Sequence, residues 1–231
     1  MKPLKVATKS LHCLPATVTF SDAAVVAGND DVSHRHARRQ ERDKVLNVAQ
    51  EENLCGSILA SMEVPLEGEK KPYTWYFLNP MALIFKMASI RPEFGDLLHK
   101  ACVQDGYMDL VLYFDEIKPG NILRPDSGRA QLCIYFTFGN LPHWARSRAW
   151  GWWHFGSFPM KLLAKVPAGA SFLMARVLDV FFGRTSSLSF ADGVPCIASC
   201  GAFVLRAHFK TLVADEKALK EAWSLDRKSV V

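Results

Sequence analysis

The sequence predicts an α/β fold, a mixed sheet flanked by helices, and two kinds of pattern support this prediction. Residues 109–115 (DLVLYFD) and 131–138 (QLCIYFTF) are short apolar runs rich in strand-forming residues, separated by a turn and a polar loop. Residues 167–182 (PAGASFLMARVLDVFF) instead keep a polar stripe at helical spacing on a surface that is otherwise apolar. We therefore expect this helix to lie against a sheet formed by the strands.

Length and composition limit the class of protein further. The chain has 231 residues, 49% of them hydrophobic and 22% charged, which is typical of a globular protein with one sizeable core. The net charge of +5 is compatible with a nucleic-acid partner but does not require one. Six scattered cysteines and no signal-peptide pattern predict reduced, buried thiols in an intracellular protein. No apolar window is continuous and long enough to predict a membrane span.

Residues 1–44 are predicted to form a poorly ordered, flexible basic arm, followed by one domain over residues 45–231. Ser33 is placed to cap a helix that runs to about Asn53. Four arginines recur on one side of that helix: Arg35, Arg38, Arg39 and Arg42. They form either a surface that contacts nucleic-acid phosphates or an ordinary solvated helix face, and the second alternative is the more common.

The first half of the domain is expected to contain a β-hairpin followed by two helices. A proline stands at the start of each helical segment, where its missing amide hydrogen has no helical partner to lose. The expected elements are strands over residues 58–66 and 73–78, then helices over 80–90 and 92–103.

The two central strands, over 109–115 and 131–138, are almost continuously apolar, so we expect both of their faces to be covered. The later elements are expected to be short strands over 188–190 and 194–198, an extended stretch over 202–215 and a helix over 216–224.

Residues 142–154 contain four tryptophans, and we expect a helix there with Trp150 and Trp153 on one face. Such aromatic residues either pack in the core, which is the alternative we favour, or stack on nucleic-acid bases. Arg146 and Arg148 in the same segment are candidates to contact nucleic acid.

Two segments end in the same way, with an apolar strand followed by Asp-Glu. Asp115 closes the first central strand, and Asp215 closes the extended stretch near the C-terminus. If these strands are neighbours, the two carboxylates converge at one edge of the sheet, where Mg²⁺ or Mn²⁺ could bind to their oxygens. Strands also commonly stop at the first charged residue, so the spacing alone is equally compatible with a coincidence.

The segment that begins at Tyr113, YFDEIKPGNILRPDSGRAQLCIYFTFGNLPHWARS, resembles the core of transposase-like proteins from cut-and-paste mobile elements of the CACTA type. The shared features are an aromatic-Asp-acid motif, a PGN turn, a polar hairpin, an apolar strand, and Asn-Leu-Pro followed by Arg-Ser. The later stretch FKTLVADEKALKEAW is similar to the second acidic strand of that group. The chain as a whole resembles a mobile-element-like family of dinoflagellate genomes.

The resemblance implies a ribonuclease-H-like fold in which three acids hold two metal ions that act on a phosphodiester. Asp115 would be the first acid and Asp215 the second, each both catalytic and metal-binding, with Mg²⁺ or Mn²⁺ as the cofactor. The third acid would lie beyond Val231, so we expect no activity from the chain alone. DNA would be the partner, contacted through the six arginines named above, and the location would be nuclear. A homo-oligomer is left open.

Two alternative functions are also compatible with the sequence. The chain could be a non-catalytic nucleic-acid-binding or interaction module derived from a mobile element, or an α/β enzyme of another class whose strand-end acids are coincidental. A zinc site at Cys196 and Cys200 is not favoured, because the pair has no second pair of ligands. His208 is expected to be a partly exposed strand residue.

Overall fold

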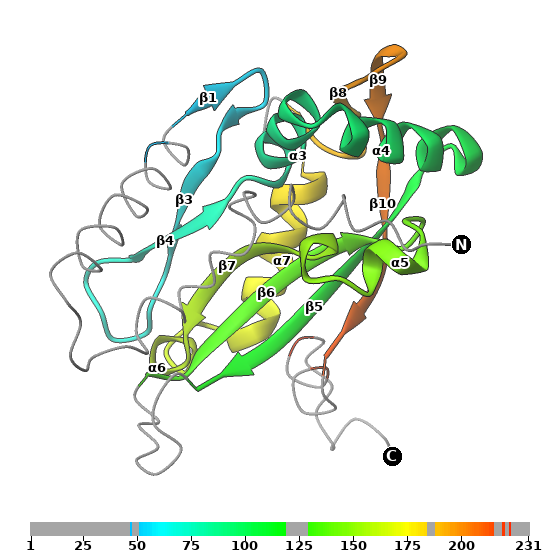
Figure 1. The fold of residues 1–231 in the computed structure, drawn as a ribbon. Helices are drawn as coiled ribbons and strands as arrows, with labels where there is room; N and C mark the ends of the chain where they lie inside the picture. The colour runs from blue at the N-terminus through cyan, green and yellow to red at the C-terminus, as the bar shows by residue number, and fades with distance from the viewer. Residues whose placement is uncertain are drawn as a thin grey trace, which may run out of the picture.

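The computed structural model describes residues 47, 51–118, 129–183, 188–214, 219 and 222 (Figure 1). The predicted arm, with its four arginines, lies outside the described residues. The elements along the chain are β1 (Glu52–Asn53), β2 (Gly56–Ser57), β3 (Leu59–Val64), β4 (Tyr73–Leu78), α3 (Pro80–Ile90), α4 (Pro92–Asp105), β5 (Met108–Ile117), β6 (Gln131–Phe138), α5 (His143–Arg146), η3 (Ala149–Gly151), β7 (Trp153–Pro159), α6 (Met160–Leu163), α7 (Gly169–Phe182), β8 (Val194–Ala198), β9 (Gly201–Leu205) and β10 (Ala207–Val213).

The centre of the fold is a four-stranded mixed sheet in the order β10-β5-β6-β7. Strands β5, β6 and β7 follow one another along the chain and pair antiparallel, whereas β10 pairs parallel to β5 on its other side. The chain between β7 and β10 runs through α7, which lies against one face of the sheet (Figure 1). The prediction of a mixed sheet flanked by helices is therefore confirmed.

Only one face of β5 belongs to the core. Its alternate residues Met108, Leu110, Leu112 and Phe114 are at most 2% exposed. Helix α7 packs on this side, because the ring of Phe181 lies 5.2 Å from that of Phe136 on β6 and 5.6 Å from that of Phe155 on β7. The intervening positions of β5 are half-buried or exposed. The expectation of two covered faces is therefore wrong for β5, whereas in β6 buried residues occur on both faces, so it is confirmed for most of that strand.

The local signals for the first two helices are confirmed. The side-chain oxygen of Asn79 accepts hydrogen bonds from the amides of Met81 (3.1 Å) and Ala82 (3.4 Å), and so caps α3 one residue before Pro80. Helix α4 begins at Pro92, as predicted, and extends two residues beyond the predicted end. Strands β3 and β4 pair antiparallel as the expected hairpin.

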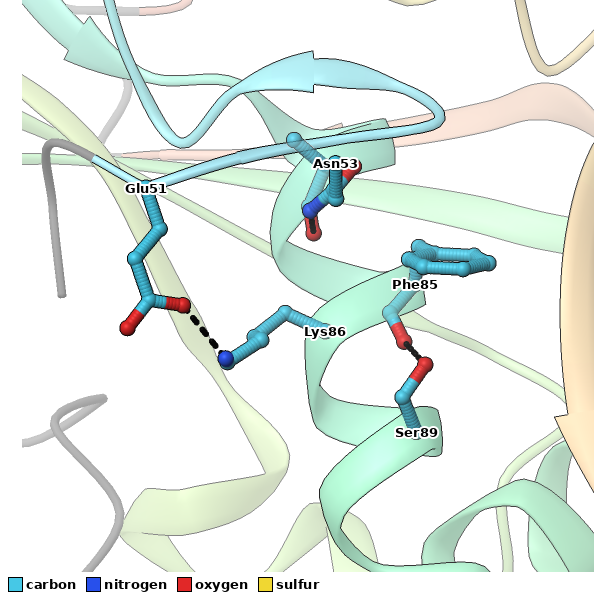
Figure 2. Close-up of polar contacts among 6 residues, drawn as sticks. Glu51, Asn53, Phe85, Lys86 and Ser89 are labelled. Atoms are coloured by element: carbon cyan, nitrogen blue, oxygen red, sulfur yellow. Dashed lines mark hydrogen bonds and ion pairs between the residues drawn. The ribbon is translucent and has the colours of Figure 1, made fainter.

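The short β1–β2 hairpin is attached to α3 by polar contacts (Figure 2). The Asn53 side-chain amide donates to the Ala82 carbonyl at 2.9 Å, and Lys86 forms an ion pair with Glu51. One turn further along α3, the Ser89 hydroxyl donates to the Phe85 carbonyl within the helix. The helix expected to reach about Asn53 does not do so, because Glu52–Asn53 forms β1.

The tryptophan-rich segment is not the single helix that was expected. Helix α5 stops at Arg146, and the chain forms a 3₁₀ turn before β7. Gly151 explains the compact turn, because a Cβ there would lie 2.2 Å from the Ala145 carbonyl oxygen. Core packing is confirmed for Trp153, which is fully buried, whereas Trp144 is 59% exposed.

The C-terminal predictions are confirmed in part. Residues 194–198 form β8 as predicted, but residues 188–190 form no strand. The extended stretch is divided at Arg206 into β9, which pairs with β8, and β10, which joins the central sheet. Most of the helix predicted over 216–224 lies outside the described residues.

Candidate functional site

Asp115 lies near the end of β5, on the face of the sheet opposite α7. We call this side the open face and define it by Asp109, Val111, Tyr113 and Asp115 of β5. Asp115 pairs with Cys133 of β6, which in turn pairs with Ser157 of β7. The neighbouring row contains Tyr113, Tyr135 and His154. Two rows of polar and aromatic side chains therefore cross three strands beside an exposed carboxylate.

A β-bulge brings two residues of β7 together on this face. In a regular strand, residues three positions apart point to opposite sides of the sheet. The register between β6 and β7 shifts between Ile134 and Tyr135, so β7 contains one extra residue at this point. As a result His154 Nε2 lies 2.9 Å from Ser157 Oγ.

Ser157 is the centre of a small hydrogen-bonded group. Its hydroxyl oxygen lies 2.9 Å from the imidazole of His154 and 3.3 Å from the Cys133 sulfur. Burial raises the pKa of the Cys133 thiol, and the hydrogen bonds from Ser157 and Tyr135 only partly oppose this shift. The thiol therefore stays protonated at neutral pH.

The aromatic members of the open face are also uncharged at neutral pH. Burial, with smaller contributions from the nearby Cys133, Asp115 and Tyr113, raises the pKa of Tyr135 to about 12. Burial lowers the pKa of His154 to about 4, against a smaller upward shift from a hydrogen bond to the Gly156 backbone. Asp115 thus contributes the negative charge beside a neutral, polar surface.

The Ser157–His154 pair has the contact distance of a nucleophile and its base, but its chemistry does not suit that role. A general base works best when its pKa lies near the operating pH, and a pKa of about 4 makes His154 a weak base. Its other polar contact is with the Gly156 backbone, whereas a catalytic imidazole is commonly oriented by a carboxylate. This geometry gives no support to a serine hydrolase.

The structure places the first predicted metal ligand and leaves the second outside the described residues. Asp115 is exposed, and no described residue donates a hydrogen bond or forms an ion pair to its carboxylate. Its neighbour Glu116 instead pairs with Lys118 at 3.2 Å. Across the described ranges, no three histidine, cysteine, aspartate or glutamate side chains are grouped closely enough to hold a metal ion. Asp215 lies just beyond the last described residue of β10.

The strands that lead to the two aspartates are neighbours. β10 pairs parallel to β5, with Leu212 opposite Leu112 and Val213 opposite Tyr113. Parallel strands point their carboxyl ends toward the same edge of a sheet. The sequence pattern predicts that Asp115 and Asp215 converge if their strands are neighbours. The pairing of β5 with β10 meets this condition.

A different acid of β5 is already neutralised. Asp109, at the start of the strand, lies 2.8 Å from His208 Nε2 and 3.5 Å from Lys210 Nζ, both on β10. The side chain of His208 is 53% exposed, which confirms the expectation of a partly exposed strand histidine. Asp109 therefore ties β5 to β10 and is a poorer candidate than Asp115 for binding a cation.

The two predicted arginines of α5 and the following turn lie beyond the end of β6, which pairs with the start of β5, and they differ in their contacts. Arg146 is exposed, but its Nε donates to the Leu141 carbonyl at 2.9 Å, so part of its guanidinium holds the turn after β6. Arg148 is exposed on the turn that precedes η3. Close to them, the exposed Trp144 contacts Trp150, with ring centroids 5.8 Å apart. Arg35, Arg38, Arg39 and Arg42 lie outside the described residues.

The sequence did not predict the group formed by Cys133, His154 and Ser157. A β-bulge has no reliable sequence signature, and a helix was expected to extend to His154. A glycine in a strand is a known sign of a bulge, so Gly156 was the one local signal available.

Comparison with protein-family models, curated proteins and solved structures found no match for this chain. Within the described part of the chain, no helix is long and apolar enough to cross a membrane.

Proposed function

We propose that this chain is a ribonuclease-H-like core from a DNA transposase-like protein, in which Asp115 and Asp215 hold a divalent cation. The observation that carries the proposal is the parallel pairing of β5 and β10, with Tyr113 opposite Val213. Each aspartate follows its paired residue by two positions in the sequence. Because the two aspartates lie equally far beyond a pair of residues in register, we expect both carboxylates to meet at one edge of the sheet.

The chemistry around Asp115 is compatible with Mg²⁺ or Mn²⁺. Hard divalent cations take oxygen ligands and keep several water molecules, so one or two carboxylates can hold them. Cys133 and Tyr135 on the neighbouring strand β6 are neutral at pH 7, and no described cation pairs with the Asp115 carboxylate. When bound, such an ion polarises a phosphoryl oxygen and neutralises charge on the phosphodiester. The proposal assigns two of the three acids that the resemblance implies, so its test measures metal binding.

DNA would approach the open face from the side of α5 and η3. Arg148 supplies an exposed positive charge there, and Trp144 supplies an exposed aromatic surface. Arginine contacts with phosphates and aromatic contacts with bases are common features of nucleic-acid-binding surfaces.

A metal titration tests the proposal directly. With a Kd of about 1 mM, about 10 mM Mn²⁺ or Mg²⁺ should stabilise the wild-type protein by about 1.4 kcal/mol. For a chain of this length, that corresponds to a rise in Tm of about 3–5 °C. Asp115→Asn and Asp215→Asn should each abolish most of this rise. Glu116→Gln is the matched control, because Glu116 is the next residue and already pairs with Lys118.

The outcomes separate the catalytic proposal from its alternative. An unchanged wild-type Tm at all metal concentrations would remove the basis for a metal site. If duplex DNA still bound under those conditions, with affinity falling steeply as salt rises, the non-catalytic module would be the better description. A metal effect that survives both aspartate substitutions would place the cation elsewhere in the chain.

A further inference from the structure

The β8–β9 hairpin is fixed against α4 at its turn. Both carboxylate oxygens of Asp96 accept hydrogen bonds from Ser199, one from its amide at 2.6 Å and one from its hydroxyl at 2.7 Å. These bonds lower the pKa of Asp96, so the contact persists as a charged one at neutral pH. One residue earlier on α4, Gly95 allows the Ile197 carbonyl to approach so closely that a Cβ would lie 1.9 Å from its oxygen.

This docking positions Cys200 beside a histidine. The sulfur of Cys200, the residue after Ser199, lies 3.5 Å from Nδ1 of His99. His99 follows Asp96 by three residues on α4, and its ring packs edge-on against Phe203 of β9 at 5.0 Å. Contacts on both sides of the turn therefore hold the thiol and the imidazole together.

Cys200 differs from the other described cysteines in its access to solvent. Cys200 is exposed, whereas the remaining four are buried: Cys55, Cys102, Cys133 and Cys196. Burial raises the pKa of Cys55 to about 11 and that of Cys196 to about 12. Nucleophilic sulfur is the thiolate, so these buried thiols are poor nucleophiles at neutral pH. The expectation that the cysteines are buried holds for these four and is wrong for Cys200.

We propose that Cys200 and His99 form a thiol-modification site that reacts with small disulfides such as oxidised glutathione. The supporting observations are the 3.5 Å contact, the exposure of the sulfur, and the fixed turn that brings it to α4. The inference is independent of the metal site and of DNA binding.

The reaction is a thiol–disulfide exchange. The imidazole of His99 takes the proton of the Cys200 thiol, and the thiolate attacks one sulfur of glutathione disulfide. A protein–glutathione S–S bond forms as the glutathione S–S bond breaks. The leaving glutathione thiolate takes the proton back from the imidazolium and departs as the thiol. Cys200 is oxidised and the small disulfide is reduced, so no further reagent is required.

Peptide mapping of the full chain after timed exposure to glutathione disulfide at neutral pH tests this site. Cys200 should be modified well before the four buried cysteines. Cys196 and Cys200 lie between Arg184 and Arg206, in one tryptic peptide, so fragment spectra are needed to separate them. The same reaction in denaturant, where every thiol is accessible, supplies the reference rate.

Substitutions then test the role of the imidazole. His99→Gln should slow modification of Cys200 by about tenfold, since the neighbour that accepts the thiol proton is lost. The same change at the exposed His143 of α5 should leave the rate unaltered. Loss of structure would expose the four buried cysteines and accelerate their modification, so unchanged slow rates at those cysteines show that His99→Gln remains folded. Modification of Cys200 no faster than that of the buried thiols, or an unchanged rate in His99→Gln, would overturn the proposal.

Discussion

The indole nitrogen of Trp75 donates a hydrogen bond to the backbone carbonyl of Ser157, 3.0 Å away, and so joins β4 to the strand that carries His154. Gly156 makes this close approach possible, because a Cβ at that position would lie 3.3 Å from Trp75 ring atoms. Trp153, on the same strand β7, is equally buried, but its indole nitrogen has no hydrogen-bond partner among the described residues. Two tryptophans with similar burial therefore differ in one hydrogen bond.

Replacing each tryptophan by phenylalanine should reveal that difference. Trp75→Phe and Trp153→Phe remove the same atoms from nearly fully buried positions, so their packing losses should be similar. Trp75→Phe additionally loses its hydrogen bond, whereas Trp153→Phe removes a buried N–H that lacks one. We expect Trp75→Phe to be the more destabilising by about 1 kcal/mol in urea unfolding. Equal losses would indicate that the Trp75 bond contributes no net stability.

The low pKa of His154 predicts that stability depends on pH. Its pKa is about 4 in the folded protein, compared with about 6.5 for an unperturbed histidine, so the unfolded chain binds the proton more readily. The contribution is therefore complete above about pH 6.5 and is lost as pH falls toward 4. From that difference, the loss across this range should be roughly 2–3 kcal/mol, and His154→Gln should flatten it. Urea unfolding at about pH 7 and pH 4.5 measures the effect.

His143 provides the control for this pH experiment. It lies exposed on α5, so His143→Gln removes a histidine without touching the buried group around Ser157. Its free energy of unfolding should fall with decreasing pH as steeply as that of the wild type. If His154→Gln also keeps the full pH dependence, burial of His154 is not its source.

Elements with local signals could be predicted from the sequence, and those that depend on tertiary contacts could not. Asn79 and Pro80 fix the start of α3 through a side-chain cap and a preset backbone angle, both of which act within one helical turn. The end of the tryptophan segment depends instead on Gly151 meeting the Ala145 carbonyl, a contact that the helical spacing of Trp150 and Trp153 does not reveal.

The candidate site shows the same division. Asp115 and the end of β5 could be located because a charge follows an apolar run. The neighbouring His154 and Ser157 could not be, since the register shift at Tyr135 decides which side of β7 they share. The open face itself was visible in the alternation of Asp109, Tyr113 and Asp115 along β5, but the apolar residues between them favoured a strand buried on both sides.

Gly95→Ala should loosen the hairpin from α4. The new Cβ would collide with the Ile197 carbonyl, which belongs to backbone and cannot move like a flexible side chain. We expect a loss of about 1–3 kcal/mol in the free energy of unfolding, measured by urea denaturation. Hydrogen exchange of the Ser199 amide should also accelerate, since its bond to Asp96 depends on the same docking.

Gly106→Ala is the comparison for Gly95→Ala. At Gly106 a Cβ would meet no atom within 4 Å, but the residue has a φ of 77°, which disfavours alanine. This variant should lose about 1–2 kcal/mol from backbone strain alone and leave the Ser199 amide protected. Faster exchange at Ser199 in both variants would mean that the hairpin responds to general destabilisation rather than to the contact at Gly95.

Substitutions at Arg146 and Arg148 should distinguish an effect on DNA binding from an effect on stability. Arg148 is exposed, so Arg148→Ala should weaken duplex binding and reduce the slope of log affinity against log salt by about 1, at unchanged stability. Arg146→Ala should weaken binding as well, and should also lower the free energy of unfolding by about 1 kcal/mol through loss of its bond to Leu141. Fluorescence anisotropy with labelled DNA at several salt concentrations measures the first effect, and urea unfolding measures the second.

A lysine at each position provides the matched test, because it keeps the charge and removes the guanidinium geometry. Arg148→Lys should restore most of the salt-dependent binding if the contact is with a phosphate. Arg146→Lys should restore binding but not stability, since a lysine lacks the Nε that reaches the Leu141 carbonyl. Absence of duplex binding by the wild-type chain at low salt would count against both nucleic-acid functions, whatever the metal titration gives. If neither alanine substitution changes duplex affinity, the DNA-binding surface does not include α5 and η3.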